Sequence, residues 1–188
     1  MDKEANFGFK AIRRLYNIKL LIRGAKVPGI LTFIILIFFI LFDEVDKSDL
    51  EVLVDLVLAY IPSLLGFVLS GYAILIGFGN IKFIAKKPES QDGETIYKPT
   101  IYQKLSTVFS MGLIMQIAML LGSIVLKLVL RTEIPCINNC FLVCRIINYS
   151  IFTLLVFGLL YITAMIKDLV VNIFNVSQYQ HLQINKKP

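Results

Sequence analysis

The chain has no tryptophan, a single histidine and three cysteines, and only 17% of its 188 residues are charged. A soluble domain usually carries about 25% charged residues. Apolar residues make up 57% of the chain, and the mean hydropathy is +0.76. Because these residues form long continuous blocks, the sequence predicts an integral membrane protein. In the absence of tryptophan, tyrosine and phenylalanine must form any aromatic belt at the membrane surface.

The apolar blocks also lack the side chains that membrane enzymes and proton-coupled transporters use. They contain no Asp, Glu, His, Lys or Arg, and the chain has no Cys-x-x-Cys pair. Transport of this kind needs an embedded carboxylate, and catalysis needs an acid, a base, a nucleophile or a metal. We therefore expect a protein that is not an enzyme and that needs no metal or cofactor. An enzyme acting on lipid is the least favoured alternative.

Four apolar segments are candidate membrane spans, at residues 27–42, 56–81, 105–126 and 146–166. Crossing the hydrocarbon core takes about 20 apolar residues in a helix, so only the first segment is short. The sequence predicts an all-α membrane protein with a bundle of four transmembrane helices within residues 27–176. The short connection after the first span predicts that the first two spans form an antiparallel hairpin.

The segments outside the spans carry most of the charge. Residues 1–26 predict a basic amphipathic helix in the plane of the headgroups. Pro28 and Gly29 then predict a turn where the chain changes direction. Pro62 predicts a kink near Leu58 in the second span. Residues 43–55 form an acidic connection, residues 82–104 a long hydrophilic one, and residues 177–188 a polar, frayed tail.

The distribution of charge predicts the orientation. Of the 19 Lys and Arg residues, 15 lie in residues 1–26, 82–104 and 167–188. Positively charged loops remain in the cytoplasm, so both termini and the connection at 82–104 are expected there. In a bacterium, the opposite face of the membrane would meet the oxidising periplasm. The basic residues are explained by anionic lipid headgroups and topology, so we expect no direct binding of nucleic acid.

Small and polar residues in the second span recur at intervals of three and four. They are Ser63, Gly66, Ser70, Ala73, Gly77 and Asn80. Such a seam lets another helix approach closely, so this face is expected to meet protein. Two interpretations remain: a seam packed inside one small bundle, or a seam that meets its copies in an oligomer or lines a pore. In the third span, Gln116 lies near the midpoint of a second interhelical face with Phe109 and Ser123.

Further candidate residues lie between the spans. The cytoplasmic positions expected to contact a partner or lipid are Arg13, Arg14, Lys82, Lys86 and Lys87. The connection at 82–104 is either a linker or a docking surface. Cys136, Cys140 and Cys144 follow a four-residue spacing, and a disulfide between Cys136 and Cys140 becomes permissible in an oxidising periplasm. A metal site would want a fourth ligand, and the only histidine, His181, is expected across the membrane.

These residues favour an oligomeric membrane sensor or scaffold that recruits or regulates a cytoplasmic effector. The lopsided charge and the connection at 82–104 support this hypothesis. The alternative is a gated ion channel or pore-forming effector, in which Ser63, Ser70 and Asn80 line a narrow path.

In its length, topology and lack of catalytic residues, the chain resembles the small four-span membrane subunits of bacterial anti-phage defence operons. The membrane subunit of the Kiwa system is the nearest of these, and Ser70-Gly71-Tyr72-Ala73-Ile74-Leu75 is similar in character to such proteins. The resemblance implies an inner-membrane homo-oligomer, a tetramer, that senses phage attack. It also implies a cytoplasmic DNA-binding partner, and it carries over no site residues.

Overall fold

The computed structural model describes residue 12 and residues 18–42, 44–77, 100–132 and 141–184. Within these ranges the chain forms four helices: α2 (Ile18–Phe42), α3 (Lys47–Gly77), α5 (Ile101–Arg131) and α6 (Phe141–Ile184). Each contains a stretch long and apolar enough to cross a bilayer. More of their large apolar side chains are exposed than are buried, and lipid would cover the exposed ones. The fold is that of an all-α, four-span membrane protein.

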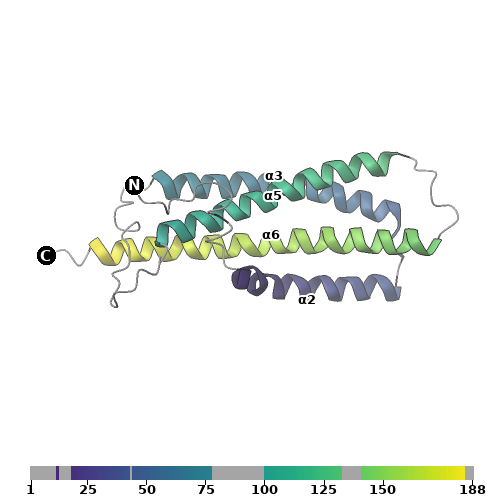
Figure 1. Ribbon diagram of the computed structural model, residues 1–188, viewed down its shortest axis with the longest axis horizontal. Helices are drawn as coiled ribbons and strands as arrows, with labels where there is room; N and C mark the ends of the chain where they lie inside the picture. Colours follow the sequence, from purple (N-terminus) through teal and green to yellow (C-terminus); the bar gives the residue numbers. More distant parts are fainter. Residues whose placement is uncertain (1–11, 13–17, 43, 78–99, 133–140, 185–188) are drawn as a thin grey trace, which may run out of the picture.

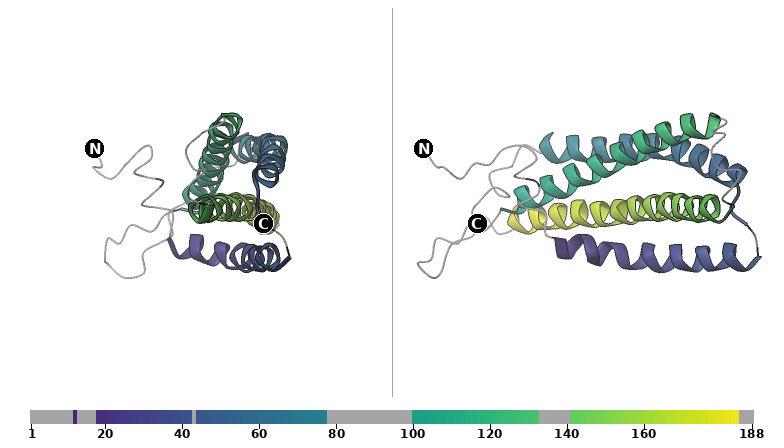
Figure 2. Two further views of the ribbon diagram at one scale, coloured as in Figure 1. Left: turned by 90° about the vertical axis from the view of Figure 1, so that its right-hand side faces the viewer. Right: turned by 45° about the vertical axis from the view of Figure 1, so that its right-hand side comes forward.

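Successive helices run in opposite directions, and α6 lies at the centre of the arrangement (Figures 1 and 2). It contacts each of the other three helices, α3 and α5 pack closely together, and the substantial contacts of α2 are with α6 alone. The first two spans are therefore antiparallel but do not pair as the short connection predicted. Helix α6, which is last in the chain, provides the surface against which α2 packs.

The predicted turn at Pro28 is wrong, because the proline lies within α2. Its side chain is buried, and the Thr32 hydroxyl donates a hydrogen bond of 2.8 Å to the Pro28 carbonyl. A proline within a helix removes one backbone hydrogen bond and bends the helix. Figures 1 and 2 show that the first turns of α2 bend away from the rest of the helix. The chain thus changes direction without leaving the helix, and residues 18–26 form the start of α2 rather than a separate helix.

The acidic connection is shorter than residues 43–55. Helix α3 begins at Lys47, so Asp49, Glu51 and Asp55 lie on its first turns. The side chains of Asp46 and Asp49 each accept a hydrogen bond from the other's backbone N–H, at 2.9 and 3.0 Å. This reciprocal cap satisfies two of the free N–H groups at the helix start. Pro62 lies inside α3, which slants in its first half and follows the long axis in its second (Figure 1).

The third and fourth spans also extend beyond their apolar cores. Helix α5 begins after Thr100, whose hydroxyl and backbone exchange hydrogen bonds with Gln103 in a capping box. Helix α6 has 44 residues, so it is about 66 Å long at about 1.5 Å per residue. It continues to Ile184, whereas the sequence predicted a frayed tail from residue 177. In Figure 1, α6 reaches beyond the neighbouring ends of α3 and α5.

The core consists of three apolar clusters at successive levels. One gathers Val68, Phe109 and Leu169; the next gathers Val57, Ile61 and Ile162; the last gathers Val45, Leu50, Phe152 and Val156. Helix α6 contributes to every cluster, which explains its central position. The clusters fix the rotation of each helix about its own axis, because burying a different face would open gaps between them.

Polar contacts join the helices at the end where α3 begins. Lys127 of α5 pairs with Asp55 of α3, and Arg145 of α6 lies 3.2 Å from Glu44. The Asn148 side-chain amide donates to the Val45 carbonyl at 3.3 Å. The acidic residues between α2 and α3 and on the first turns of α3 therefore meet the cations at the end of α5 and the start of α6, at one end of the molecule. All four charged groups are partly exposed, so each pair contributes about 0–1 kcal/mol.

Gly71 is a glycine of α3 that side chains of α5 and α6 approach closely. A Cβ atom at this position would lie 3.3 Å from Phe109 and 3.4 Å from Ile173. Gly71→Leu should therefore destabilise the fold, because overpacking costs about 1–3 kcal/mol. Since the chain has no tryptophan, the measurement is the temperature at which the peak of the folded, detergent-solubilised protein is lost in size-exclusion chromatography.

The matched control for this prediction is Gly29→Leu on α2, because a Cβ at Gly29 meets nothing within 4 Å and Gly29 lies outside the seam of α3. This variant gains the same helix propensity without the crowding and should keep or raise the melting temperature. Equal melting temperatures for the two variants would contradict the packing described for Gly71.

Candidate functional site

The small-residue seam of α3 lies on the outside of the chain. Its described members are all exposed: Ser63, Gly66, Ser70, Ala73 and Gly77. Added Cβ atoms at Gly66 and Gly77 would meet nothing within 4 Å. The interpretation that the seam packs inside this one bundle is therefore wrong for these residues. Asn80 lies outside the described residues.

A different face of α3 packs against α5 and α6. Its buried positions are Leu50, Val54, Val57, Ile61 and Val68. At about 100° per residue, the mean direction of the seam lies about 180° around the helix axis from this face. Both faces repeat at intervals of three and four residues, so the spacing alone could not decide between them. The large aliphatic residues could have predicted which face of α3 packs in the bundle. This face also includes one small residue, Gly71.

Gln116 lies inside the bundle, with 2% of its surface exposed. Phe109 and Ser123, seven residues to either side of it, are buried on the same face of α5. The Gln116 Oε1 atom and the Ser123 hydroxyl are both buried without a hydrogen-bond partner. Gln116 thus faces the bundle as the interhelical face predicted, but its Oε1 atom accepts no hydrogen bond from a neighbouring helix. An unpaired polar atom costs about 1–3 kcal/mol when buried, so these two groups need an explanation other than stability.

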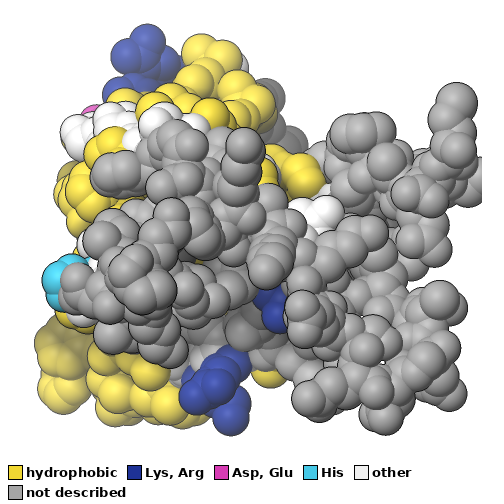
Figure 3. All heavy atoms as spheres, turned by 90° about the vertical axis from the view of Figure 1, so that its left-hand side faces the viewer, with side chains coloured by type: hydrophobic (Ala, Val, Ile, Leu, Met, Phe, Trp, Pro, Cys, Tyr) yellow, Lys and Arg dark blue, Asp and Glu magenta, His cyan; other side chains and the backbone are white. Residues whose placement is uncertain are grey.

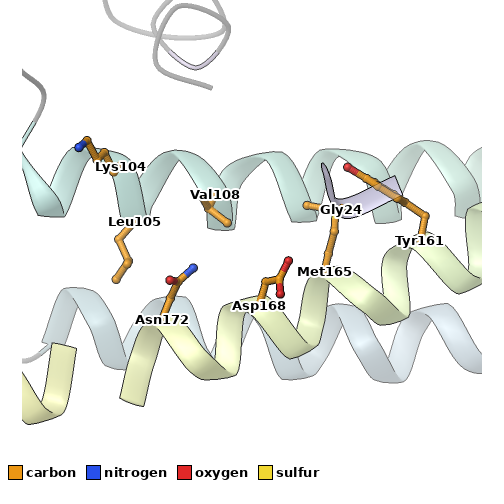
Figure 4. Close-up of a pocket in the computed structure, with 8 residues that line it drawn as sticks. All are labelled: Gly24, Lys104, Leu105, Val108, Tyr161, Met165, Asp168 and Asn172. Atoms are coloured by element: carbon orange, nitrogen blue, oxygen red, sulfur yellow. The ribbon is translucent and has the colours of Figure 1, made fainter. Parts of the chain in front are cut away.

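A small pocket lies where the start of α2 meets α5 and α6 (Figure 4). It encloses about 240 Å³, and Tyr161, Asp168 and Asn172 of α6 contribute its polar side chains. In the close-up these side chains point toward α5, while Lys104 points away from the space. Asp168 lies 3.6 Å from the adjacent Lys167 ammonium, and both are exposed. The arrangement can hydrogen-bond a polar headgroup at the membrane surface.

The two ends of the described bundle differ in charge. Around the pocket end lie four cations and one carboxylate: Arg23, Lys26, Lys104, Lys167 and Asp168. The opposite end has five carboxylates and four cations: Glu44, Asp46, Asp49, Glu51, Asp55, Lys47, Lys127, Arg131 and Arg145. Figure 3 looks at the first of these ends and shows Lys and Arg side chains between apolar ones. The more basic end is the one expected in the cytoplasm.

Several predicted site residues lie outside the described part of the chain. They are Arg13, Arg14, Lys82, Lys86, Lys87, Cys136 and Cys140. Cys144 is half-buried in the first turns of α6. Among the described residues, no three His, Cys, Asp or Glu side chains gather closely enough to hold a metal ion.

Comparison with known proteins adds no relative: no family model, curated protein or solved structure matches this chain. The established conclusion is therefore the architecture, a multi-pass membrane protein with four spans. The function has to be argued from the surfaces that the four helices leave exposed.

The charge difference between the two ends generates a test of orientation. Ser48 and Ser177 are exposed at opposite ends, so each can be replaced by cysteine after the three native cysteines are changed to serine. We expect a membrane-impermeant maleimide to label the Ser48→Cys protein in intact spheroplasts. The Ser177→Cys protein should be labelled only after permeabilisation. The reverse pattern would contradict the positive-inside assignment, and denatured samples of both variants control for reactivity.

Proposed function

We propose that this protein is an oligomeric scaffold or sensor of the bacterial inner membrane that recruits or regulates a soluble cytoplasmic effector. The observation that supports this proposal is the position of the α3 seam. A face of small residues with open space beside it points away from the chain's own bundle, where a second copy can reach it. Small side chains allow the close backbone approach that drives helix association in lipid.

The polar groups of the seam do not oppose such an interface. The Ser70 hydroxyl donates to the Gly66 carbonyl at 2.9 Å, so it enters the interface already satisfied. Helix association in a bilayer depends on packing rather than on removal of apolar surface from water, because lipid is as apolar as leucine. A strip of glycine, alanine and serine offers more backbone contact to another helix than to mobile lipid chains.

The more basic end of the bundle supports the proposal that the protein recruits a cytoplasmic partner. Helix α6 continues past the described ends of α3 and α5 at the more basic end, and the described side chains of Ser177, Gln178 and His181 there are exposed (Figure 1). This organisation agrees with the resemblance to the Kiwa membrane subunit, which implies a tetramer, a role in anti-phage defence and a DNA-binding partner. The partner contact is expected at this end together with the connection at 82–104.

The interface is tested by filling the seam. Gly66→Leu combined with Gly77→Leu should weaken self-association by about tenfold or more, since overpacking a close helix contact costs about 1–3 kcal/mol. The measurement is the mass of the protein in mild detergent by light scattering, over a range of concentrations. The fold should persist, because neither glycine touches another helix of its own chain.

Gly29→Leu is the matched control for the seam variant. Gly29 is also a glycine of a membrane helix with open space around it, but it lies on α2. This control should retain the wild-type mass. A wild-type protein that is monomeric throughout, or a seam variant with unchanged self-association, would contradict the proposal.

The second candidate function is a gated pore, which the exposure of Ser63 and Ser70 on the seam favours. If seams from several copies surround an axis, these hydroxyls face it. Ser70→Leu should then abolish ionic current in planar bilayers while the oligomer persists. Wild-type oligomers that conduct no current, with and without a cytoplasmic partner, would leave the scaffold as the function.

A further inference from the structure

Helix α2 has a shorter apolar stretch than its neighbours. Its candidate span, Ile22–Phe42, includes the cations Arg23 and Lys26, so only residues 27–42 are uncharged. This stretch is about 24 Å long at about 1.5 Å per residue, whereas a hydrocarbon core is about 30 Å thick. The uncharged stretches of α5 and α6 are about 33 and 32 Å long, at residues 105–126 and 146–166. The same bilayer therefore fits α5 and α6 but is too thick for α2.

The missing length lies at the more basic end of α2. At the opposite end α2 is level with α6, because the rings of Phe39 and Phe152 are 4.6 Å apart. At the more basic end, a Cβ atom on Gly24 would lie 3.8 Å from the ring of Tyr161. Figure 1 shows that the described start of α2 lies inside the ends of α3, α5 and α6.

The two cations of α2 consequently lie beside the apolar part of α6. Arg23 and Lys26 flank Gly24, and both are exposed. Tyr161 lies about 9 Å along α6 from Lys167, the first cation after the uncharged stretch of that helix. Because the substantial contacts of α2 are with α6 alone, no other helix of the described bundle encloses these cations.

A bilayer can accommodate a short span by thinning, by snorkelling of the flanking side chains or through association of the protein with further copies. Tilting does not help, because it shortens the part of the helix that projects along the membrane normal. A charged group in hydrocarbon is more costly than a few ångströms of thinning. The decisive question is whether headgroups and water can reach the depth of Gly24.

The pocket between the start of α2, α5 and α6 provides such a path. Figure 4 shows Asn172 and Asp168 nearer the end of the bundle, and Gly24 beside Tyr161 deeper in the span. The pocket encloses about 240 Å³, which is the volume of about eight water molecules at about 30 Å³ each. A phosphate-bearing headgroup with some water can therefore descend along these polar side chains to the level of Gly24.

We propose that phospholipid headgroups descend beside α2, with their phosphates on Arg23 and Lys26, so that the leaflet at the more basic end is about 6 Å thinner there. The leaflet keeps its ordinary thickness beside α5, whose uncharged stretch is long enough. The protein thus selects short acyl chains on one side only, and it does so independently of any oligomer or effector.

The chain has no tryptophan, so a single introduced tryptophan reports on the lipids that touch it. Ile34→Trp and Ile117→Trp place it at exposed positions near the middle of the uncharged stretches of α2 and α5. The full-length protein is placed in mixed vesicles of dimyristoleoyl and dierucoyl phosphatidylcholine, each brominated in turn to quench the fluorescence. The short-chain lipid should be favoured about twofold or more beside Ile34→Trp, with no such preference beside Ile117→Trp.

Equal selectivity at the two positions, or no short-chain preference beside α2, would overturn the proposal. So would an absence of quenching by either lipid at Ile34→Trp, because protein rather than lipid would then cover α2.

Changes to the two cations test their role. Arg23→Leu with Lys26→Leu extends the uncharged stretch of α2 to residues 20–42 and should abolish the selectivity beside Ile34→Trp. Lys167→Leu removes a cation from α6 at the same end and should leave the selectivity unchanged. Arg23→Lys with Lys26→Arg keeps both charges and should retain it. Selectivity that persists in the double leucine variant, or that is lost in the charge-conserving variant, would overturn the proposal.

Discussion

The structure depends on the constraint that a bilayer core contains no water to satisfy polar groups. The backbone is therefore helical throughout the spans, and most of the described hydroxyl groups there hydrogen-bond within their own helix, as Thr32, Ser150 and Thr163 do. Groups satisfied in this way do not select a neighbouring helix. The choice of neighbour is left to the shapes of side chains, and the clusters around Val57, Phe109 and Phe152 show how shape decides it.

Helix α3 shows how this choice works on a single helix. It carries two faces with the same spacing, one of large aliphatic residues and one of small residues. The large face fills the space against α5 and α6, because those helices leave room for Val57, Ile61 and Val68. At Gly71 the large face has a small residue, and the ring of Phe109 lies against it. The small face remains available because nothing within the chain is shaped to reach it.

The sequence predicted the number of spans and their order, because hydropathy acts locally. It placed a turn at Pro28, where the proline lies within the continuous helix α2. It extended the acidic connection too far, because Asp49, Glu51 and Asp55 lower the hydropathy without interrupting the helix. It also predicted that α2 packs on α3, because chain proximity was the only guide to pairing. Helix α2 packs against α6, and Gly66 and Gly77 point outward, because of which helix surfaces fit together. The spacing of residues in the sequence does not show which surfaces fit.

Two exposed features of the molecule, the α3 seam and an apolar groove of about 480 Å³ between α5 and α6, do not compete for one surface. The seam lies on the side of α3 that faces away from its contacts with α5 and α6, whereas the groove lies between those two helices. The unpaired Ser123 hydroxyl lies beside the groove, and the hydroxyl of Ser70 on the seam is paired. The exposed hydroxyl of the seam is thus satisfied within its own helix, whereas the unpaired hydroxyl of Ser123 is enclosed within the bundle and does not meet lipid.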